Sequence, residues 1–249
     1  MIETFWKPCG ITSNDFADYM KVQLQTNKLC YAGRLDPLAQ GVMLILTNEH
    51  TKNMNHHLTH NKVYRFQMVL GVSTKSQDIA GAVTGLQSVQ ASQQQICDEL
   101  AKFVETYTTQ QYPLVSSYVV RQGANKKPLW WYDKHGIHVD DIPSKEVKIH
   151  NYNVEQVEHY TSDMLCHLAL NRLNMIRNEK TRDDLQVDKL MQQYEYIAST
   201  ELKNHVLSVV TMTLDVSTGF YVRKFCEDFG AHLGVPCCTF DITRLRIYQ

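Results

Sequence analysis

Residues 31–52, YAGRLDPLAQGVMLILTNEHTK, decide the fold because they join a tight turn to an apolar run. Residues 42–46 are all apolar, and a run of that length after turn residues predicts a buried strand. Pro37 has no amide proton and restricts the residue before it to extended or turn geometry. The stretch therefore predicts that a short, stiff loop presents Asp36 at the start of a core strand. An Asp-Pro pair alone is typical of a turn, so a turn residue and a functional carboxylate both remain open.

The composition is that of an ordinary globular protein, with 249 residues of which 43% are hydrophobic and 20% charged. This length allows one large domain or two small ones. The net charge of -1 argues against strong non-specific nucleic-acid binding, although a local basic patch can still hold RNA. No apolar run is long enough to span a bilayer, and no secretory signal is visible. We therefore expect no membrane partner and a cytoplasmic protein, or a nuclear or mitochondrial one in a eukaryotic cell.

The cysteines and histidines do not predict a metal site. The 7 cysteines form no C-x-x-C pair and no zinc-finger pattern, which predicts reduced thiols. His56, His57 and His60 could meet at helical spacing. A solvated polar loop is the better interpretation, because no carboxylate or cysteine joins them at ligand spacing. We expect no bound metal.

Alternating apolar and polar residues mark several further strands. In residues 62–70 the alternation places Tyr64 on the more apolar face, where a buried tyrosine needs a partner for its hydroxyl. Half-buried strands favour an α+β fold with a mixed or antiparallel sheet over a doubly wound parallel one. The predicted strands are 42–46, 62–70, 117–120, 145–157, 207–216 and 239–248, the predicted helices are 16–29, 91–107, 171–204 and 221–233, and residues 5–13 are predicted as a loop.

A basic and aromatic cluster lies in residues 113–137. Lys126, Lys127 and Trp130 come close together there, beside further aromatic residues. Cations interleaved with aromatic rings suit looped RNA, because they combine phosphate contacts with base stacking. A small hydrophobic core with lysines reaching to solvent fits the pattern equally well. Both interpretations stay open on the sequence alone.

Six motifs, in the same order, resemble those of the TruB-type pseudouridine synthases, the enzymes that make pseudouridine 55 in the T-loop of tRNA. The best of them surrounds Asp36, where G-x-L-D-P-L-A-x-G-V is shared. The resemblance covers nearly the whole chain and leaves out residues 171–204. The matching residues are Lys7, Pro8, Gly10, Thr12 and Ser13; Gly33, 35–39 and 41–42; Lys62 and Tyr64; Leu70, Gly71, Thr74, Asp78 and Gly81; Gly219, Tyr221 and Arg223; Asp228 and Gly230.

The resemblance implies a pseudouridine synthase fold, with a mixed, mainly antiparallel central sheet flanked by helices and loops. It implies that residues 1–249 are the catalytic domain, with a helical insertion at about 171–205 and no C-terminal RNA-binding domain. The resemblance implies an isomerase that converts uridine to pseudouridine, with U55 of tRNA as its specific target. The expected partner is the T-arm of tRNA, and the protein is expected to act as a monomer. The reaction oxidises nothing and transfers no group to a second molecule, so we expect no cofactor.

The resemblance also assigns the site. Asp36 would act at the sugar as nucleophile or base, because carboxylates stabilise the oxocarbenium character that glycosidic cleavage creates. Arg223 would keep that carboxylate ionised and oriented, and Tyr64 would stack on the flipped base and accept the C5 proton. The expected substrate-binding residues are Tyr221, Tyr31, Arg34, Lys62, Lys126, Lys127 and Trp130.

Three departures from the family pattern leave the exact RNA target open. Tyr31 stands where the family has His, Phe220 replaces a Thr, and Arg34 gives a G-R-L-D sequence similar to another branch of pseudouridine synthases. A synthase acting on another RNA site is therefore one alternative. A non-catalytic chaperone that folds tRNA is the other, and the presence of Asp36, Tyr64 and Arg223 argues against it.

Overall fold

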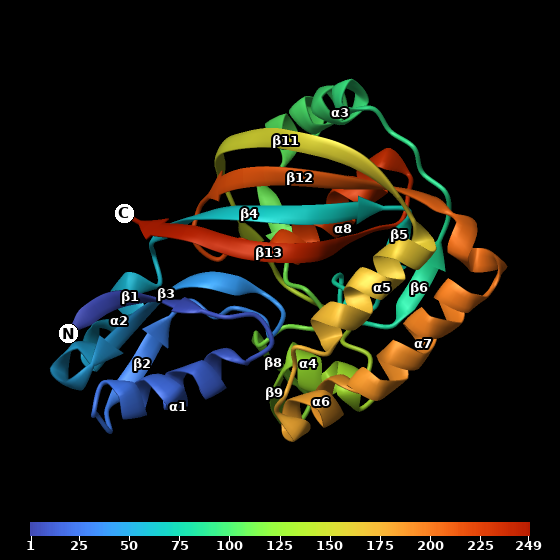
Figure 1. The fold of residues 1–249 in the computed structure, drawn as a ribbon. Coiled ribbons are helices and arrows are strands. Elements are labelled where there is room, and N and C mark those ends of the chain that lie inside the picture. The colour runs from blue at the N-terminus through green and yellow to red at the C-terminus, as the bar shows by residue number, and fades with distance from the viewer.

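The computed structural model describes residues 1–249, and its centre is a seven-stranded sheet (Figure 1). The strand order is β1-β3-β13-β4-β12-β11, and β2 pairs separately with β3. Only the pair of β13 and β3 is parallel, so the predicted α+β fold with a mixed, mainly antiparallel sheet is confirmed. The strands are β1 (Ile2–Lys7), β2 (Leu29–Ala32), β3 (Gln40–Thr47), β4 (Asn61–Leu70), β11 (Ile149–Thr161), β12 (Val206–Val216) and β13 (Cys237–Tyr248).

Helices and three small two-stranded sheets surround the central sheet. The helices are α1 (Ser13–Gln23), α2 (Met54–His57), α3 (Gln93–Thr106), α4 (Leu129–Lys134), α5 (Ser162–Leu173), α6 (Glu179–Leu185), α7 (Val187–Ser199) and α8 (Val222–Leu233), with 3-10 turns at Asn48–Asn53 and Glu201–Asn204. The small sheets pair β5 (Val72–Thr74) with β6 (Val83–Leu86), β7 (Thr109–Gln111) with β10 (Ser144–Glu146), and β8 (Val119–Gln122) with β9 (Asn125–Pro128).

Two hydrophobic cores lie on opposite faces of the sheet. On one face, side chains of β4 such as Phe66 pack against Phe103 of α3 and Phe225 of α8. On the other face, Val69 of β4 belongs to the core formed with α5 and α7. The sheet is therefore buried on both sides where α5 and α7 lie, and Tyr64 lies on the α3–α8 side, as the alternation predicts.

The helical segment between β11 and β12 is inserted into a hairpin. Thr161 pairs with Val206 across the two strands, so residues 162–205 leave and re-enter the sheet at one point. The helices begin at Ser162, nine residues before the predicted start, because the sequence 162–173 carries its apolar face in a weakly periodic pattern. Figure 1 shows α5, α6 and α7 of this segment at one end of the sheet.

Three local predictions were wrong. Residues 2–7 form strand β1 rather than loop and flanking chain; it is an edge strand with only Lys7 buried, so its alternation is weak. The first helix ends at Gln23 instead of residue 29, because Gln25 adopts a left-handed backbone (φ 50°). The predicted strand 145–157 is two strands, β10 and β11, which pair with different partners.

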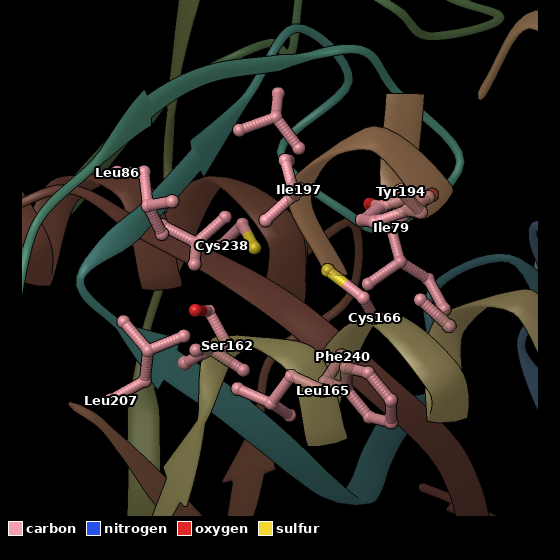
Figure 2. Close-up of a pocket in the computed structure, with 14 residues that line it drawn as sticks. Ile79, Leu86, Ser162, Leu165, Cys166, Tyr194, Ile197, Leu207, Cys238 and Phe240 are labelled. Carbon is pink, nitrogen blue, oxygen red and sulfur yellow. The ribbon is translucent and has the colours of Figure 1, made fainter. Parts of the chain in front are cut away.

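A small apolar cavity of about 30 Å³ lies between the inserted helices and the sheet. Its lining is almost entirely hydrophobic, which is typical of a dry packing defect rather than a ligand site. Figure 2 shows the cavity lined by Leu165 and Cys166 of α5, Tyr194 and Ile197 of α7, and Leu207, Cys238 and Phe240 of the strands.

No helix is both long and apolar enough to cross a lipid bilayer.

Candidate active site

The loop that carries Asp36 is held through its backbone carbonyls by buried cations. Lys7 Nζ donates to the carbonyl of Ala39 at 2.7 Å, and Lys7 is 0% exposed. Arg244 of β13 donates to the carbonyls of Gly33 and Val42 at 2.9 and 2.6 Å. Charge-assisted bonds of this kind are about twice as strong as neutral ones. The loop is therefore fixed from β1 and β13, which are distant from it in the sequence.

Helix α1 and segment α5 hold the same loop from two more sides. Ser13 Oγ both accepts from the Leu35 amide (2.9 Å) and donates to the Leu35 carbonyl (2.8 Å). Arg172 of α5 donates to the Leu38 carbonyl at 2.9 Å and to Asp241 of β13 at 2.6 Å. These bonds flank Asp36 on both sides, so its backbone is rigidly positioned.

Gly41 permits the close packing of this loop against β13. Its backbone has φ 121°, and a Cβ added there would lie 2.2 Å from the carbonyl oxygen of Arg244. Only glycine fits such an approach at such a dihedral angle. The Gly41 match in the motif thus has a physical cause.

Asp36 and Arg223 form an ion pair at the N-terminus of α8. Arg223 Nε donates to Asp36 Oδ2 at 2.8 Å, and Nη2 donates to Oδ1 at 3.3 Å. The remaining donors of Arg223 bind the carbonyls of Ser76 (2.7 Å) and Val115 (3.0 Å). The Arg223 side chain is only 5% exposed, whereas that of Asp36 is 36% exposed. The arginine is therefore part of the protein interior, and it directs the Asp36 carboxylate toward solvent.

Asp78 lies behind Arg223 as a second carboxylate. Its Oδ2 is 3.7 Å from Arg223 Nε, and its Oδ1 accepts from Ser76 Oγ (2.5 Å) and the Ala80 amide (3.0 Å). Burial raises the pKa of Asp78, and the Arg223 charge opposes that rise. The guanidinium is thus placed between two acids, which fixes its plane.

Two tyrosines line the same cleft as Asp36. Tyr64 of β4 is 7% exposed, and its hydroxyl makes no hydrogen bond within the protein. The Tyr221 backbone is fixed by Gln110, which donates to its carbonyl and accepts from its amide at 2.9 and 2.8 Å. Burial and the negative charge of Asp36 raise the pKa of Tyr221 to about 12, so its hydroxyl is neutral at physiological pH. Both hydroxyls can interact with a base or sugar entering the cleft.

Lys145 is a cleft residue that the sequence did not single out. Its ammonium lies 4.3 Å from the ring centroid of Tyr221 and 4.7 Å from that of Tyr112, and it pairs with no carboxylate. Burial and the nearby charge of Lys62 lower the pKa of Lys145 to about 8. No signal within residues 144–146 marks this lysine, because its environment comes from β7 and the N-terminus of α8.

The predicted substrate-binding residues near the loop lie in different situations. The Tyr31 hydroxyl donates to Asn14 at 2.6 Å and accepts from Arg34 at 3.2 Å. Arg34 is exposed and lines the cleft. Lys62 also lines the cleft but is buried, and its ammonium donates to the carbonyl of His60. Arg34 thus lies at the surface of the cleft, whereas the ammonium of Lys62 is occupied within the protein.

The basic and aromatic cluster of residues 113–137 divides in two. Trp130 on α4 is 41% exposed and lines the cleft. Lys126 and Lys127 are exposed on β9 and do not line it, and Lys127 lies over the ring of Trp131 at 5.7 Å. A small core around Leu129, Tyr132 and Val139 lies beneath them, so the alternative of a hydrophobic core is also realised here.

The cleft is positively charged in a protein whose net charge is -1. Its volume is about 1590 Å³, larger than the roughly 300–1,000 Å³ of small-molecule pockets. A cleft of this size and sign suits a nucleic-acid strand. Its lining includes nine Lys or Arg against six Asp or Glu: Arg34, Lys62, Lys75, Lys134, Lys145, Lys180, Lys189, Arg223 and Arg244 against Asp15, Asp18, Asp36, Asp133, Asp184 and Glu146.

Residues 21–171 match the model of the TruB family pseudouridylate synthase N-terminal domain. The chain belongs to the TruB family. A tRNA pseudouridine synthase B of Blochmanniella floridana is 27% identical over 98% of this chain and 74% of its own length. Its counterpart in Malacoplasma penetrans is 26% identical over 97% of this chain and 82% of its own length. The tRNA pseudouridine synthase B of Thermotoga petrophila is 26% identical, and this chain spans 60% of it.

Solved structures show the same fold in larger chains. One is an H/ACA RNP bound to a substrate RNA containing 2'-deoxyuridine (TM-score 0.53, 15% identity, 98% of this chain and 46% of that chain). Another is a Cbf5-Nop10-Gar1 complex (TM-score 0.55, 15% identity, 99% of this chain and 48% of that chain). The TruB-type resemblance of the motifs and the expected fold are both confirmed.

Sequence reasoning missed the residues that support the loop. Lys7 and Ser13 belong to a shared motif, which gives them a position but no role. Arg172 and Arg244 carry no local signal, since their function depends on contacts 134 and 211 positions away. No group of three His, Cys, Asp or Glu side chains is arranged to hold a metal ion.

Proposed function

We propose that this protein is an isomerase that converts uridine to pseudouridine in tRNA, and that its target is U55 of the T-loop. The observation that carries the proposal is the Asp36–Arg223 ion pair, which opens into a positively charged cleft. Membership of the TruB family and the names of its relatives support tRNA as the substrate. Residues 1–249 act as one catalytic domain with the helical insertion, and the protein works as a monomer.

The reaction breaks the N1–C1′ bond, rotates the uracil and forms the C1′–C5 bond. C5 then loses its proton and N1 gains one, so atoms and charge balance without a redox partner. Asp36 acts at the sugar, where positive charge develops at the anomeric carbon. Arg223 sets the plane of this carboxylate through two parallel bonds.

Tyr64 receives the base. Its ring stacks on the flipped uracil, and its unpaired hydroxyl accepts the C5 proton, directly or through water, as it passes its own proton to solvent. Tyr221 borders the same space with a neutral hydroxyl. Lys145, which has no carboxylate partner, supplies positive charge for the phosphate of the flipped nucleotide.

The target uridine must leave the RNA stack before Asp36 can reach it, which costs roughly a few kcal/mol. Bases in a T-loop are already partly unstacked, and stacking on Trp130 offsets part of the remainder. Arg34 and Tyr31 lie at the loop that presents Asp36, so they contact the nucleotides beside the target. A pseudouridine synthase for another RNA site is the second candidate, because these are the residues in which the family motif differs.

The test is pseudouridine mapping on unmodified tRNA transcript by carbodiimide treatment and primer extension. We expect a stop at position 55 with the wild-type protein and none with Asp36→Asn. Activity that survives in Asp36→Asn would overturn the mechanism, and a stop at another uridine would overturn the target. Faster tRNA folding without any pseudouridine would instead identify a chaperone.

A further inference from the structure

The helical insertion forms one wall of the active-site cleft. Helices α6 and α7 contribute side chains to the same cleft that Asp36 opens into. Lys134 of α4 pairs with Asp184 of α6 at 2.7 Å, so the wall continues directly into the helix that carries Trp130. The polar side chains of this wall include Asn178, Lys180, Thr181, Asp184, Gln186 and Lys189.

Most of the acids in α6 and at the start of α7 lie away from the cleft, whereas two lysines of the insertion line it. Lys180 and Lys189 line the cleft, and neither pairs with a carboxylate. The single acid on the wall, Asp184, is neutralised by Lys134. The other acids of α6 and the start of α7 do not line the cleft, and one of them, Asp188, pairs with Arg182. Residues 171–204, which hold six acids and six Lys or Arg, therefore present two unpaired positive charges to the cleft.

The wall is fixed relative to the catalytic loop. Arg172, at the end of α5, binds the Leu38 carbonyl two residues after Asp36. Gly10 lies so close to Met175 that an added Cβ would be 2.3 Å from the Met175 carbonyl oxygen. Gln193 of α7 donates to and accepts from the Val83 backbone at 3.0 and 2.9 Å. These contacts hold both ends of the segment against the body of the protein.

We propose that the α6–α7 wall is a second contact surface for the substrate RNA, on which Lys180 and Lys189 bind backbone phosphates. The inference rests on the proposed function and extends it to a surface outside the shared motifs. Phosphates fit better than bases, because the wall offers ammonium groups and no aromatic ring to the cleft. The contact raises affinity for RNA and leaves the chemistry at Asp36 unchanged.

The test measures RNA affinity in an Asp36→Asn background, so that binding is separated from turnover. Lys180→Gln with Lys189→Gln removes both charges, and Lys148→Gln with Lys203→Gln removes two exposed lysines that do not line the cleft. The two double variants therefore change net charge equally. We expect the Kd for full-length tRNA at fixed salt to rise about tenfold only in the first. For this variant, the slope of log Kd against log salt concentration should be smaller by about one to two.

Equal weakening in both double variants, or none in either, would overturn the proposal. A parallel titration with the isolated T-arm stem-loop identifies which phosphates are bound: an unchanged Kd there assigns the contact to RNA outside the arm. Thermal unfolding should be the same in the Asp36→Asn parent and in both double variants. Pseudouridine formation by the Lys148/Lys203 variant with Asp36 intact should keep its wild-type kcat and KM. If wild-type protein makes no pseudouridine while the Kd difference persists, the proposed function fails and the RNA surface stands.

Discussion

Arg223 Nε lies 2.8 Å from Asp36 Oδ2, and the two residues are 187 positions apart in the sequence. The arginine is buried with all its groups engaged, so it presents Asp36 in one orientation. Lysine has one compact ammonium and cannot reproduce the fork that meets both carboxylate oxygens. The pair therefore fixes geometry as well as charge.

Arg223→Lys should lower kcat by about 100-fold at saturating tRNA, because a misplacement of about 1 Å at the reacting atoms costs that much. It should also lower the free energy of unfolding by about 3–5 kcal/mol, since Asp78 keeps no full partner in the interior. Single-turnover pseudouridine formation and urea denaturation measure the two effects. A variant with the stability loss but wild-type kcat would show that the pair is structural.

Arg172→Met tests whether the bond from Arg172 to the Asp36 loop contributes to catalysis as well as to the stability of the protein. It removes the bond to the Leu38 carbonyl together with the ion pair to Asp241. Asp241→Asn removes only the charge of the ion pair. We expect about a tenfold loss of kcat with little change in KM for Arg172→Met, and a kcat near wild type for Asp241→Asn. Equal loss of kcat in both variants would assign the effect to the ion pair.

Pseudouridine formation should decline as the pH rises above about 8. Burial lowers the pKa of Lys145 to about 8, with Lys62 adding to the shift, while the rings of Tyr112 and Tyr221 face its ammonium. The Lys145 ammonium, for which we propose a role in attracting RNA phosphate, is present below that pH and lost above it. Lys145→Arg keeps its charge, so its alkaline limb should move upward. A limb that stays at pH 8 would point to Lys7 or Lys62, whose pKa values are also lowered to about 8.

Unfolding of the protein should not explain the decline in pseudouridine formation above pH 8. A lysine whose pKa is lower in the folded state binds its proton more tightly when unfolded. The free energy of unfolding contributed by Lys7, Lys62 and Lys145 therefore rises between about pH 8 and the ordinary value of 10.5. Thermal unfolding measured at pH 7 and pH 9 gives the control.

Leu165→Ala should lower the free energy of unfolding by about 2–5 kcal/mol, because Leu165 is 6% exposed in the core between α5 and the sheet. Met164→Ala, its exposed neighbour on the same helix, should change it by less than about 0.5 kcal/mol. A single urea transition in both variants would show that the insertion unfolds with the sheet. Two transitions in Leu165→Ala would contradict the proposal of one domain.

The sequence predicted the elements whose pattern is strongly periodic. The face of β4 that carries Tyr64 and the helices predicted at 91–107 and 221–233 follow from local physics. β1 could not be predicted in the same way, because an exposed edge strand buries almost no side chains. The pairing of Asp36 with Arg223 was expected only from the resemblance, since no local pattern connects two residues so far apart.

The residues that support the Asp36 loop and line the cleft could not be predicted from local sequence patterns, for a related reason. Lys145 acquires its environment from Tyr112 and Tyr221, and neither lies near it in the sequence. Arg172 lies in the segment that no motif covers. Buried cations are rare enough that sequence patterns assign them to the surface, where most lysines and arginines lie.

The position of β13 has a consequence for how the molecule assembles. The unit formed by β1, β2 and β3 joins the rest of the sheet only through β13, which follows every other strand in the sequence. Arg244 of that strand also closes the Asp36 loop. During synthesis the Asp36 carboxylate therefore emerges early, and its loop lacks the bonds from Arg244 until the ribosome has delivered β13. Pairings across such separations form slowly, so an incomplete nascent chain cannot act on RNA before its sheet is closed.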